Sequence, residues 1–437
     1  MNSQDRRSTG LMHHATRLQA GCVAIIHRAV QAFRSLRRQE SSVFNAAMLD
    51  DPYPSYQRLR SEDPVHWEAA ANRWVLTRYA DVACVLRSPL ASSQRVQALE
   101  RFVPAAYRPL LEFRKNSMIS NDAPRHNRLR MLVNKAFTAR AVEAMTDNIQ
   151  RLVDGFLDTA QSRGRFDVIA DLAYPLPVTV IAEMLGVPAD DRDQFKGWSD
   201  ELVILAGAAG SPAALRPDDY RRIASSQQQL TDYLKNIVAQ RRMQPGSDLL
   251  SALAQAEESG DRLSEDELYA NAILILVAGH ETTTNLIGNG MLALLRHPDQ
   301  LERLRNDPAL IPTAVEELLR YDSPVQFTTR VLKDDLEVNG KTLKRGQIAL
   351  LLLGAANRDP AQFPEPDRLD VGRSDNKHLA FGLGSHFCLG AQLARLEARI
   401  AFETMLRRLP DLRLGEVTPR FRDHYNLRGL KSLMVDF

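Results

Sequence analysis

The sequence predicts a mainly α-helical protein with small β-sheets, folded as one compact domain. One long apolar segment runs from Ser264 to Pro298, and most of the remaining chain also has the pattern of helices. Apolar residues alternate at period two in only two short regions, which indicates minor sheets. From Asp51 onward the 437-residue chain has no linker rich in Pro, Gly or Ser and no internal repeat, so one domain is the simplest organisation.

The composition excludes several classes of protein. The chain is 44% apolar and 25% charged, as in ordinary globular proteins, and its net charge of +2 is too small to indicate a nucleic-acid partner. The cysteines Cys22, Cys84 and Cys388 lie far apart and do not resemble a disulfide framework. We therefore expect a protein of the reducing cytoplasm, and we expect it to be a monomer.

Residues 1–43 form a basic extension that is separate from the main domain at 44–437. The extension holds seven arginines against two acidic residues, Asp5 and Glu40, and none of its apolar runs is long enough to span a bilayer. Two interpretations stay open. It is an amphipathic helix that touches a membrane surface, or it is a solvated tail, including one that results from a start codon placed too far upstream.

Two pairs of apolar stretches predict the strands. Residues 65–67 and 74–77 have apolar side chains at period two and predict the first sheet. Residues 328–336 and 343–352 are rich in β-branched and apolar residues and predict the second.

The longest helix begins after Ser264. Ser264 and Glu267 have the spacing of a capping box, in which each side chain bonds to the backbone N–H of the other residue. The helix ends near His297, because Pro298 disfavours helical geometry in the residue before it. About 30 residues at a rise of 1.5 Å give roughly 45 Å, enough to cross a whole domain.

The middle of this helix contains polar residues where a core is expected. Residues 279–284, Gly-His-Glu-Thr-Thr-Thr, follow a segment that is apolar around nearly its full circumference. Unpaired polar groups in a core are costly, so either these residues carry a function or the threonines bond back to carbonyls one turn earlier. A zinc-protease motif is excluded because Thr284 stands where a second histidine would be required.

One cysteine lies in a distinctive loop. Cys388 is preceded by Gly382 and Gly384 and followed by Gly390, at the start of a helix expected to run to about Arg399. The glycines allow left-handed turns and the close approach of a flat ligand, and the helix N-terminus favours a thiolate. The glycines do not match a nucleotide-binding loop, whose third glycine is replaced here by Phe387.

These residues resemble the cytochrome P450 family. Its F-x-x-G-x-x-x-C-x-G signature is matched by Phe381, Gly384, Cys388 and Gly390. Three further segments match in the family's order, namely Ala278–Thr282, Glu317–Arg320 and Asp122–Arg130. The resemblance covers about Asp51 to Phe437 and implies the single-domain cytochrome P450 fold, with residues 44–437 as the catalytic domain.

The resemblance implies haem b, with Cys388 as the axial thiolate ligand of the iron. It also implies a set of side chains around the haem, in which cations hold the two propionates. The cofactor-binding residues would be Cys388, His126, Arg130, Arg330, His386, Phe381, Gly384, Gly390 and Ala278. A structural charge network would join Glu317 and Arg320 to Arg368.

The resemblance also implies an oxygenation. Glu281 and Thr282 would manage protons on the haem face opposite Cys388, where a hydroxyl with an acid beside it orders water. By position, the walls of the substrate pocket would be Leu274, Val277, Ala278, Val325 and Phe327. The expected reaction inserts one oxygen atom from O2 into a hydrophobic small molecule, by hydroxylation or epoxidation, in secondary or lipid metabolism.

Electrons would come from a ferredoxin or flavodoxin with its reductase. The segment from Cys388 to Phe437 is too short to hold a fused flavin or iron–sulfur domain. Four basic residues, Arg125, Arg128, Lys135 and Arg399, are a candidate docking patch. Two alternatives stay open, a peroxide-driven peroxygenase or isomerase and a non-catalytic haem-binding protein. The acid and hydroxyl at 281 and 282 argue against both.

Overall fold

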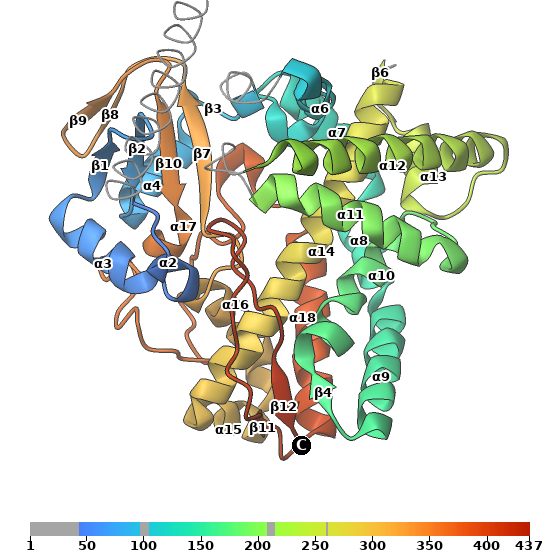
Figure 1. Ribbon diagram of the computed structural model, residues 1–437, viewed down its shortest axis with the longest axis vertical. Helices are drawn as coiled ribbons and strands as arrows, with labels where there is room; N and C mark the ends of the chain where they lie inside the picture. The colour runs from blue at the N-terminus through green and yellow to red at the C-terminus, as the bar shows by residue number, and fades with distance from the viewer. Residues whose placement is uncertain (1–42, 97–104, 208–214, 259–260) are drawn as a thin grey trace, which may run out of the picture.

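The computed structural model describes residues 43–96, 105–207, 215–258 and 261–437. The extension predicted for residues 1–43 lies outside these ranges except for Val43, whose backbone N–H donates to Glu68. Within the described ranges, no helix has both the length and the apolar character needed to cross a lipid bilayer. Helices make up most of the molecule, and a small sheet lies at one side (Figure 1).

The bounds of the elements are as follows. The helices are α2 (Ala47–Asp50), α3 (Tyr53–Glu62), α4 (Tyr79–Arg87), α6 (Arg108–Lys115), α7 (Arg125–Ala136), α8 (Ala139–Glu143), α9 (Thr146–Arg163), the π-helix η4 (Ile169–Ala173), α10 (Pro175–Met184), α11 (Arg192–Gly207), α12 (Pro217–Met243), α13 (Leu249–Gln255), α14 (Glu265–Arg296), α15 (Pro298–Asn306), α16 (Ile311–Tyr321), α17 (Leu353–Ala356) and α18 (Ala391–Arg408). The strands are β1 (Val65–Glu68), β2 (Arg73–Leu76), β3 (Ala91–Ser92), β4 (Phe166–Asp167), β5 (Glu257–Glu258), β6 (Asp261–Arg262), β7 (Phe327–Leu332), β8 (Leu336–Val338), β9 (Lys341–Leu343), β10 (Ile348–Leu352), β11 (Arg413–Leu414) and β12 (Met434–Asp436). The predicted class, mainly α with small sheets, is confirmed.

The largest sheet unites the two regions that were expected to form separate sheets. Its order is β1-β2-β10-β7-β3, with β10 parallel to β2 and antiparallel to β7. The predicted strand 343–352 is interrupted, because its first residue belongs to the β8–β9 hairpin and Gly346 turns the chain at φ +80° before β10 begins. Side chains alternate along β7, so Thr328 and Arg330 share one face and Phe327 lies on the other.

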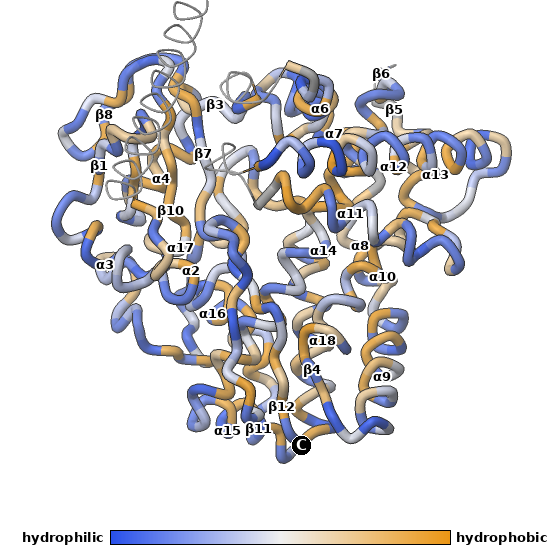
Figure 2. Tube along the Cα trace, viewed as in Figure 1, coloured by the Kyte–Doolittle hydropathy of each residue, from blue (hydrophilic) through white to orange (hydrophobic). Residues whose placement is uncertain are grey.

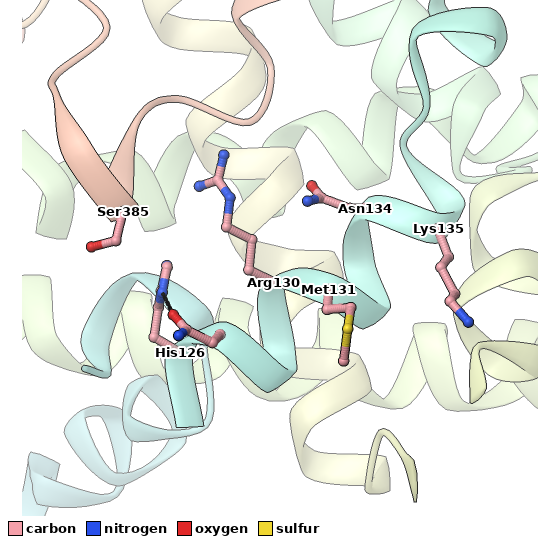
Figure 3. Close-up of a pocket in the computed structure, with 7 residues that line it drawn as sticks. His126, Arg130, Met131, Asn134, Lys135 and Ser385 are labelled. Carbon is pink, nitrogen blue, oxygen red and sulfur yellow. Dashed lines mark hydrogen bonds between the residues drawn. The ribbon is translucent and has the colours of Figure 1, made fainter. Parts of the chain in front are cut away.

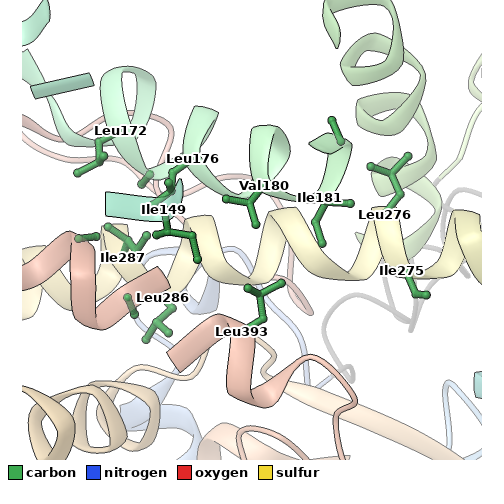
Figure 4. Packing of buried hydrophobic residues seen from close by; sticks show 14 of the residues in the cluster. Ile149, Leu172, Leu176, Val180, Ile181, Ile275, Leu276, Leu286, Ile287 and Leu393 are labelled. Carbon is green, nitrogen blue, oxygen red and sulfur yellow. The ribbon is translucent and has the colours of Figure 1, made fainter. Parts of the chain in front are cut away.

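Helix α14 passes through the centre of the helical part and carries the capping box expected from the sequence. Ser264 Oγ accepts from the Glu267 N–H at 3.3 Å, and the Glu267 carboxylate accepts from the Ser264 N–H at 3.2 Å. The helix packs against α10 on one side and α18 on another, and Figure 4 shows Val180, Ile181 and Leu393 directed toward it. Buried residues of these three helices belong to one hydrophobic cluster, and hydrophobic and hydrophilic residues alternate along the helices in Figure 2.

Close packing at the α14–α18 crossing depends on a glycine. A Cβ added at Gly290 would lie 2.7 Å from Cζ of Phe402 on α18 and 3.0 Å from Cδ1 of Leu318 on α16. A side chain at this position would therefore require Phe402 and Leu318 to shift. The packing holds α14 in a fixed place between α18, which follows the cysteine loop, and the helices on the other side.

Candidate active site

The cysteine loop is shaped by two left-handed glycines. Gly382 and Gly384 have φ +71° and +77°, and the Cys388 N–H donates to the Phe381 carbonyl at 2.9 Å. A Cβ at Gly384 would lie 3.1 Å from the carbonyl oxygen of Leu86, so the loop is seated against the end of α4. These contacts close a compact turn that delivers Cys388 to the start of α18.

The Cys388 side chain is accessible and lines a cavity of about 300 Å³. Its surroundings act on the thiol in two directions. On balance the pKa of Cys388 is raised, because burial outweighs the Gly390 N–H and the nearby guanidiniums of Arg130 and Arg395, which lower it. The donors stabilise a thiolate, and a cation bound at the sulfur would reinforce them, as expected for a metal-ligating cysteine.

The cavity walls are mainly apolar and come from distant parts of the chain. Helix α14 contributes Leu274, Ala278, Gly279 and Thr282, and the segment before β7 contributes Val325. Phe381 and Gly390 line the cavity on the side of Cys388, whereas Gly384 does not line it and instead forms the turn against α4. Figure 4 shows part of the packing behind these walls around α14.

Basic side chains contribute to the cavity lining. His126, Arg130, Arg330 and His386 all line it, and the two imidazole rings lie 4.1 Å apart between centroids. Arg330 Nη1 donates to the Thr329 carbonyl at 2.9 Å, so its orientation is set by β7 itself. Burial lowers the pKa of Arg330 to about 10, and it stays a cation at neutral pH. A ligand with two carboxylates would require hydrogen-bond donors of this kind.

These residues fit the haem that the cysteine motif implies. A flat and largely apolar dianion needs an apolar space, a soft axial ligand and cations for two carboxylates. The cavity combines an accessible cysteine, walls dominated by aliphatic side chains and arginines in its lining, and no Asp or Glu stands among the described residues that line it. Cys388 would hold the iron, and Arg130, Arg330, His126 and His386 would hold the propionates.

A second hollow of about 450 Å³ lies on the outer side of α7. It is lined by His126, Arg130, Met131, Asn134, Lys135 and neighbours, and Figure 3 shows Ser385 facing α7 from the cysteine loop. His126 and Arg130 line both spaces. The inner cavity and this hollow therefore adjoin at two side chains of α7.

Thr282 and Glu281 do not face the same space. Thr282 lines the cavity, and its hydroxyl donates to the Ala278 carbonyl at 2.8 Å. Glu281 does not line it. The Glu281 carboxylate is 3% exposed and lies 2.6 Å from Nη1 of Arg422. The reason is helix geometry, because consecutive residues are about 100° apart around the axis.

The three hydroxyls of α14 all bond back to the helix. Thr283 donates to the Gly279 carbonyl at 3.2 Å and Thr284 to the His280 carbonyl at 2.9 Å, as Thr282 does to Ala278. The backbone-bonding interpretation of these threonines is therefore correct for all three. Thr282 and Thr283 additionally reach the cavity, whereas Thr284 is not among its lining residues.

The charge network beneath the cysteine loop differs from the prediction at one residue. Arg320 donates two hydrogen bonds, of 2.7 and 2.8 Å, to the Glu317 carboxylate, and both side chains are fully buried. The prediction that Arg368 is the third member is wrong. The Arg368 guanidinium pairs with the exposed Glu365, and only the backbone carbonyl of Arg368 accepts a hydrogen bond from Arg320. Arg373 takes that place, with Nε 3.1 Å from Glu317.

Two predicted pocket walls are also wrong. Phe327 packs on the other face of the sheet against Phe44 and a buried cluster, because the alternation of β7 turns it away from Thr328. Val277 packs against the hydrophobic core and is not a cavity residue, whereas Leu274, Ala278 and Val325 are.

Three residues of the site were not identified from the sequence. Arg95 lines the cavity, and Arg373 completes the buried network. Glu397 on α18 is 1% exposed, its Oε1 has no hydrogen-bond partner, and burial raises its pKa to about 8 despite a bond to Thr283. A glutamate among apolar neighbours in the helix after Cys388 was a usable signal for Glu397. No motif singles out Arg95.

Comparisons with known proteins agree with this geometry. The family model for cytochrome P450 matches residues 85–423. The cytochrome P450 monooxygenase PikC of Streptomyces venezuelae is 42% identical over 398 residues, covering 88% of this chain and 91% of that protein. The vitamin D(3) 25-hydroxylase of Pseudonocardia autotrophica is 42% identical over 407 residues, covering 91% and 96%.

A solved structure gives the same answer at the level of the fold. P450BioI in complex with an acyl carrier protein ligated to hexadec-9Z-enoic acid superposes with a TM-score of 0.83 and 38% identity, covering 90% of this chain and all of that one. The residues matched by the family model include the cysteine loop, α14 and β7, all of which contribute to the cavity lining. This chain is a member of the cytochrome P450 family of monooxygenases.

Proposed function

We propose that the chain is a haem-thiolate monooxygenase that inserts one oxygen atom from O2 into a hydrophobic small molecule. The observation that carries the proposal is the cavity in which accessible Cys388, cavity-facing Thr282 and the lining arginines Arg130 and Arg330 occur together. Haem b ligated by the Cys388 thiolate supplies the activation of O2 when it is bound. The chain's own part is to hold that cofactor, orient the substrate and direct protons.

Thr282 is the group that orders water in the cavity. Its donor is committed to the Ala278 carbonyl, so its oxygen lone pairs are free to accept from a water at the cavity surface. Glu281 is the proposed proton source on the neighbouring side of α14, where its carboxylate pairs with Arg422. The apolar walls exclude other water, which keeps the proton supply confined to this turn of the helix.

The cofactor assignment is tested on enzyme supplied with haemin. The wild-type protein is expected to bind it and, when reduced under carbon monoxide, to show the red-shifted absorption of thiolate coordination. Cys388→Ser is expected to abolish that absorption, and Cys84→Ser, which changes the other cysteine of the described chain, is expected to leave it unchanged. A wild-type protein that stays colourless would end the proposal.

The role of Thr282 is tested by matched threonine variants. Thr282→Ala is expected to divert electrons from product to peroxide by roughly tenfold, and Thr282→Ser to keep the coupling because it retains the hydroxyl. Thr284→Ala is the control, since Thr284 makes the same helix bond outside the cavity lining. Equal coupling in Thr282→Ala and Thr284→Ala would contradict the assignment.

An external ferredoxin or flavodoxin, with its reductase, is the proposed electron source. Of the candidate docking residues, Arg125 and Arg128 are engaged with Glu267 at 3.1 and 2.5 Å, while Lys135 borders the outer hollow (Figure 3). Beside Lys135, Met131 exposes 43% of its surface, so the hollow offers both charge and apolar area. Turnover with reductase and ferredoxin should exceed turnover with peroxide alone; the reverse result would indicate a peroxygenase.

Hydrophobic metabolites are the proposed substrates, in secondary or lipid metabolism. The support is the aliphatic lining of the cavity together with the names of relatives, which include a vitamin D(3) hydroxylase and a fatty-acyl carrier complex. The described cysteines form no disulfide, in keeping with a cytoplasmic setting. Spectral titration with a panel of lipophilic compounds tests this class, and tight binding of polar metabolites alone would contradict it.

A further inference from the structure

The cavity carries more positive charge than its cofactor requires. Three arginines line it, Arg95, Arg130 and Arg330, and no Asp or Glu lines it within the described residues. A bound haem brings two propionate charges, and the charge of a ferric porphyrin core is offset by the Cys388 thiolate. Among the described residues, one arginine charge therefore remains.

Asp122 does not remove this excess. It is the acid that acts on Arg330, but it does not line the cavity. One Asp122 oxygen accepts from Ser92 Oγ at 2.6 Å and lies 3.9 Å from Lys333 Nζ, while the other accepts from the Ser93 N–H at 2.8 Å. Its oxygens are thus occupied by Ser92 and Ser93, and its carboxylate forms a long ion pair with the half-exposed Lys333.

Arg95 and Arg130 are the cavity arginines with few partners, and Arg130 makes no hydrogen bond or ion pair within the described residues. Arg330 is anchored at 2.9 Å to the Thr329 carbonyl, and Arg130 lies near Cys388. Arg95 has a single long contact of 3.5 Å, from Nη1 to Thr328 Oγ1, which leaves most of its N–H donors without a described partner. A guanidinium held in a largely apolar space without an anion is costly.

The charges around Arg95 add to this cost. Burial is the main cause that lowers the pKa of Arg95 to about 9, and Arg330 and Arg114 lower it further. Arg114, on α6, also has its pKa lowered by burial and makes no ion pair within the described part of the chain. Arg95, three residues after the end of β3, thus experiences repulsion from two other cations, and an anion beside it would relieve that repulsion.

We propose that Arg95 binds a carboxylate of the substrate, so that this enzyme favours apolar acids over their neutral counterparts. The inference rests on the proposed monooxygenase function and names the substrate class of the same cavity. The apolar body of the acid would lie along the α14 wall formed by Leu274 and Ala278, with its charged end at Arg95. A planar guanidinium suits this role because it can donate two parallel bonds to one carboxylate.

The test uses haem-loaded enzyme and the spectral shift that a ligand causes on binding. The probes are lauric acid, palmitic acid and lithocholic acid, each titrated beside its own primary amide. Wild-type enzyme is expected to bind at least one acid about tenfold more tightly than its amide, a preference that corresponds to roughly 1.4 kcal/mol. Arg95→Gln is expected to remove the preference, and Arg95→Lys to retain most of it.

Several outcomes would overturn the proposal. It fails if wild-type enzyme prefers none of the acids, or if Arg95→Gln keeps the preference. Haem content is measured in parallel, because a loss of haem in Arg95→Gln with an unchanged acid preference would make Arg95 a propionate partner instead. Arg330→Gln is the comparison for this loss of haem, since removing a propionate partner is expected to lower haem retention. The carbon-monoxide spectrum of wild-type enzyme reports separately on the monooxygenase assignment.

Discussion

The Glu281 carboxylate and the Arg422 guanidinium meet at 2.6 Å and tie the centre of α14 to the C-terminal part of the chain. Glu281 is 4% exposed at its side chain, whereas Arg422 is 27% exposed. The pair therefore holds a carboxylate inside the protein with a partner that solvent can reach. It connects α14, which lines the cavity, to a segment far away in the sequence.

Removing Arg422 should destabilise the protein more than removing the whole pair. Arg422→Gln leaves a buried carboxylate unpaired, and we expect a loss of about 2 kcal/mol, less than for a fully buried pair. The double variant Glu281→Gln with Arg422→Gln is expected to recover more than half of it. Thermal unfolding of the two variants and the wild type measures this. A double variant less stable than Arg422→Gln would contradict the explanation.

The two arginines near the Glu317–Arg320 pair should behave differently. Arg373→Gln removes a guanidinium whose side chain is 11% exposed and contacts Glu317, so it is expected to lower thermal stability by several degrees and reduce haem content. Arg368→Gln removes an exposed partner of Glu365 and is expected to change stability by less than about 1 kcal/mol. Equal effects of the two substitutions would show that the network has been misassigned.

Glu316 should contribute stability that depends on pH. Burial acts to raise its pKa, but bonds from Arg395 and His378 outweigh burial and lower the pKa to about 2. Because the pKa in the folded state is below that of the unfolded chain, the contribution is present above about pH 4.5 and is lost as the pH falls toward 2.

Glu316→Gln is therefore expected to cost about 2–3 kcal/mol near neutral pH and progressively less below about pH 4. Urea unfolding of the variant and wild type across this range gives the difference. Glu365→Gln, which breaks an exposed pair, serves as the control and should cost less than about 1 kcal/mol throughout. A Glu316→Gln difference that is constant with pH would exclude this linkage.

Two glycine-to-alanine substitutions should change the stability of the protein in opposite directions. Gly290→Ala places a methyl group against Phe402 and Leu318 at the α14–α18 crossing and is expected to destabilise by about 1–3 kcal/mol. Gly155 lies on the exposed face of α9 with no atom within 4 Å of an added Cβ, so Gly155→Ala should stabilise by up to about 1 kcal/mol. Thermal unfolding compares them, and a neutral Gly290→Ala would mean that the crossing can relax.

Much of the site follows from local sequence. The Ser264–Glu267 cap, the glycines before Cys388 and the Glu317–Arg320 pair each depend on residues close together in the chain. Such contacts are set by the periodicity of helices and by allowed backbone angles, which are properties of short segments. This is why the helix through the core, the cysteine loop and the family could be predicted.

Tertiary structure decided which distant side chains met. Arg373 rather than Arg368 reaches Glu317, Arg422 captures Glu281, and Arg95 enters the cavity from the end of β3. Phe327 lies on the side of the sheet away from the cavity, because strand pairing sets which face of β7 borders the cavity. The sequence by itself determined the chemistry available at Cys388 and along α14. Which charges surround that chemistry depends on how elements pack in three dimensions, and local periodicity carries no information about it.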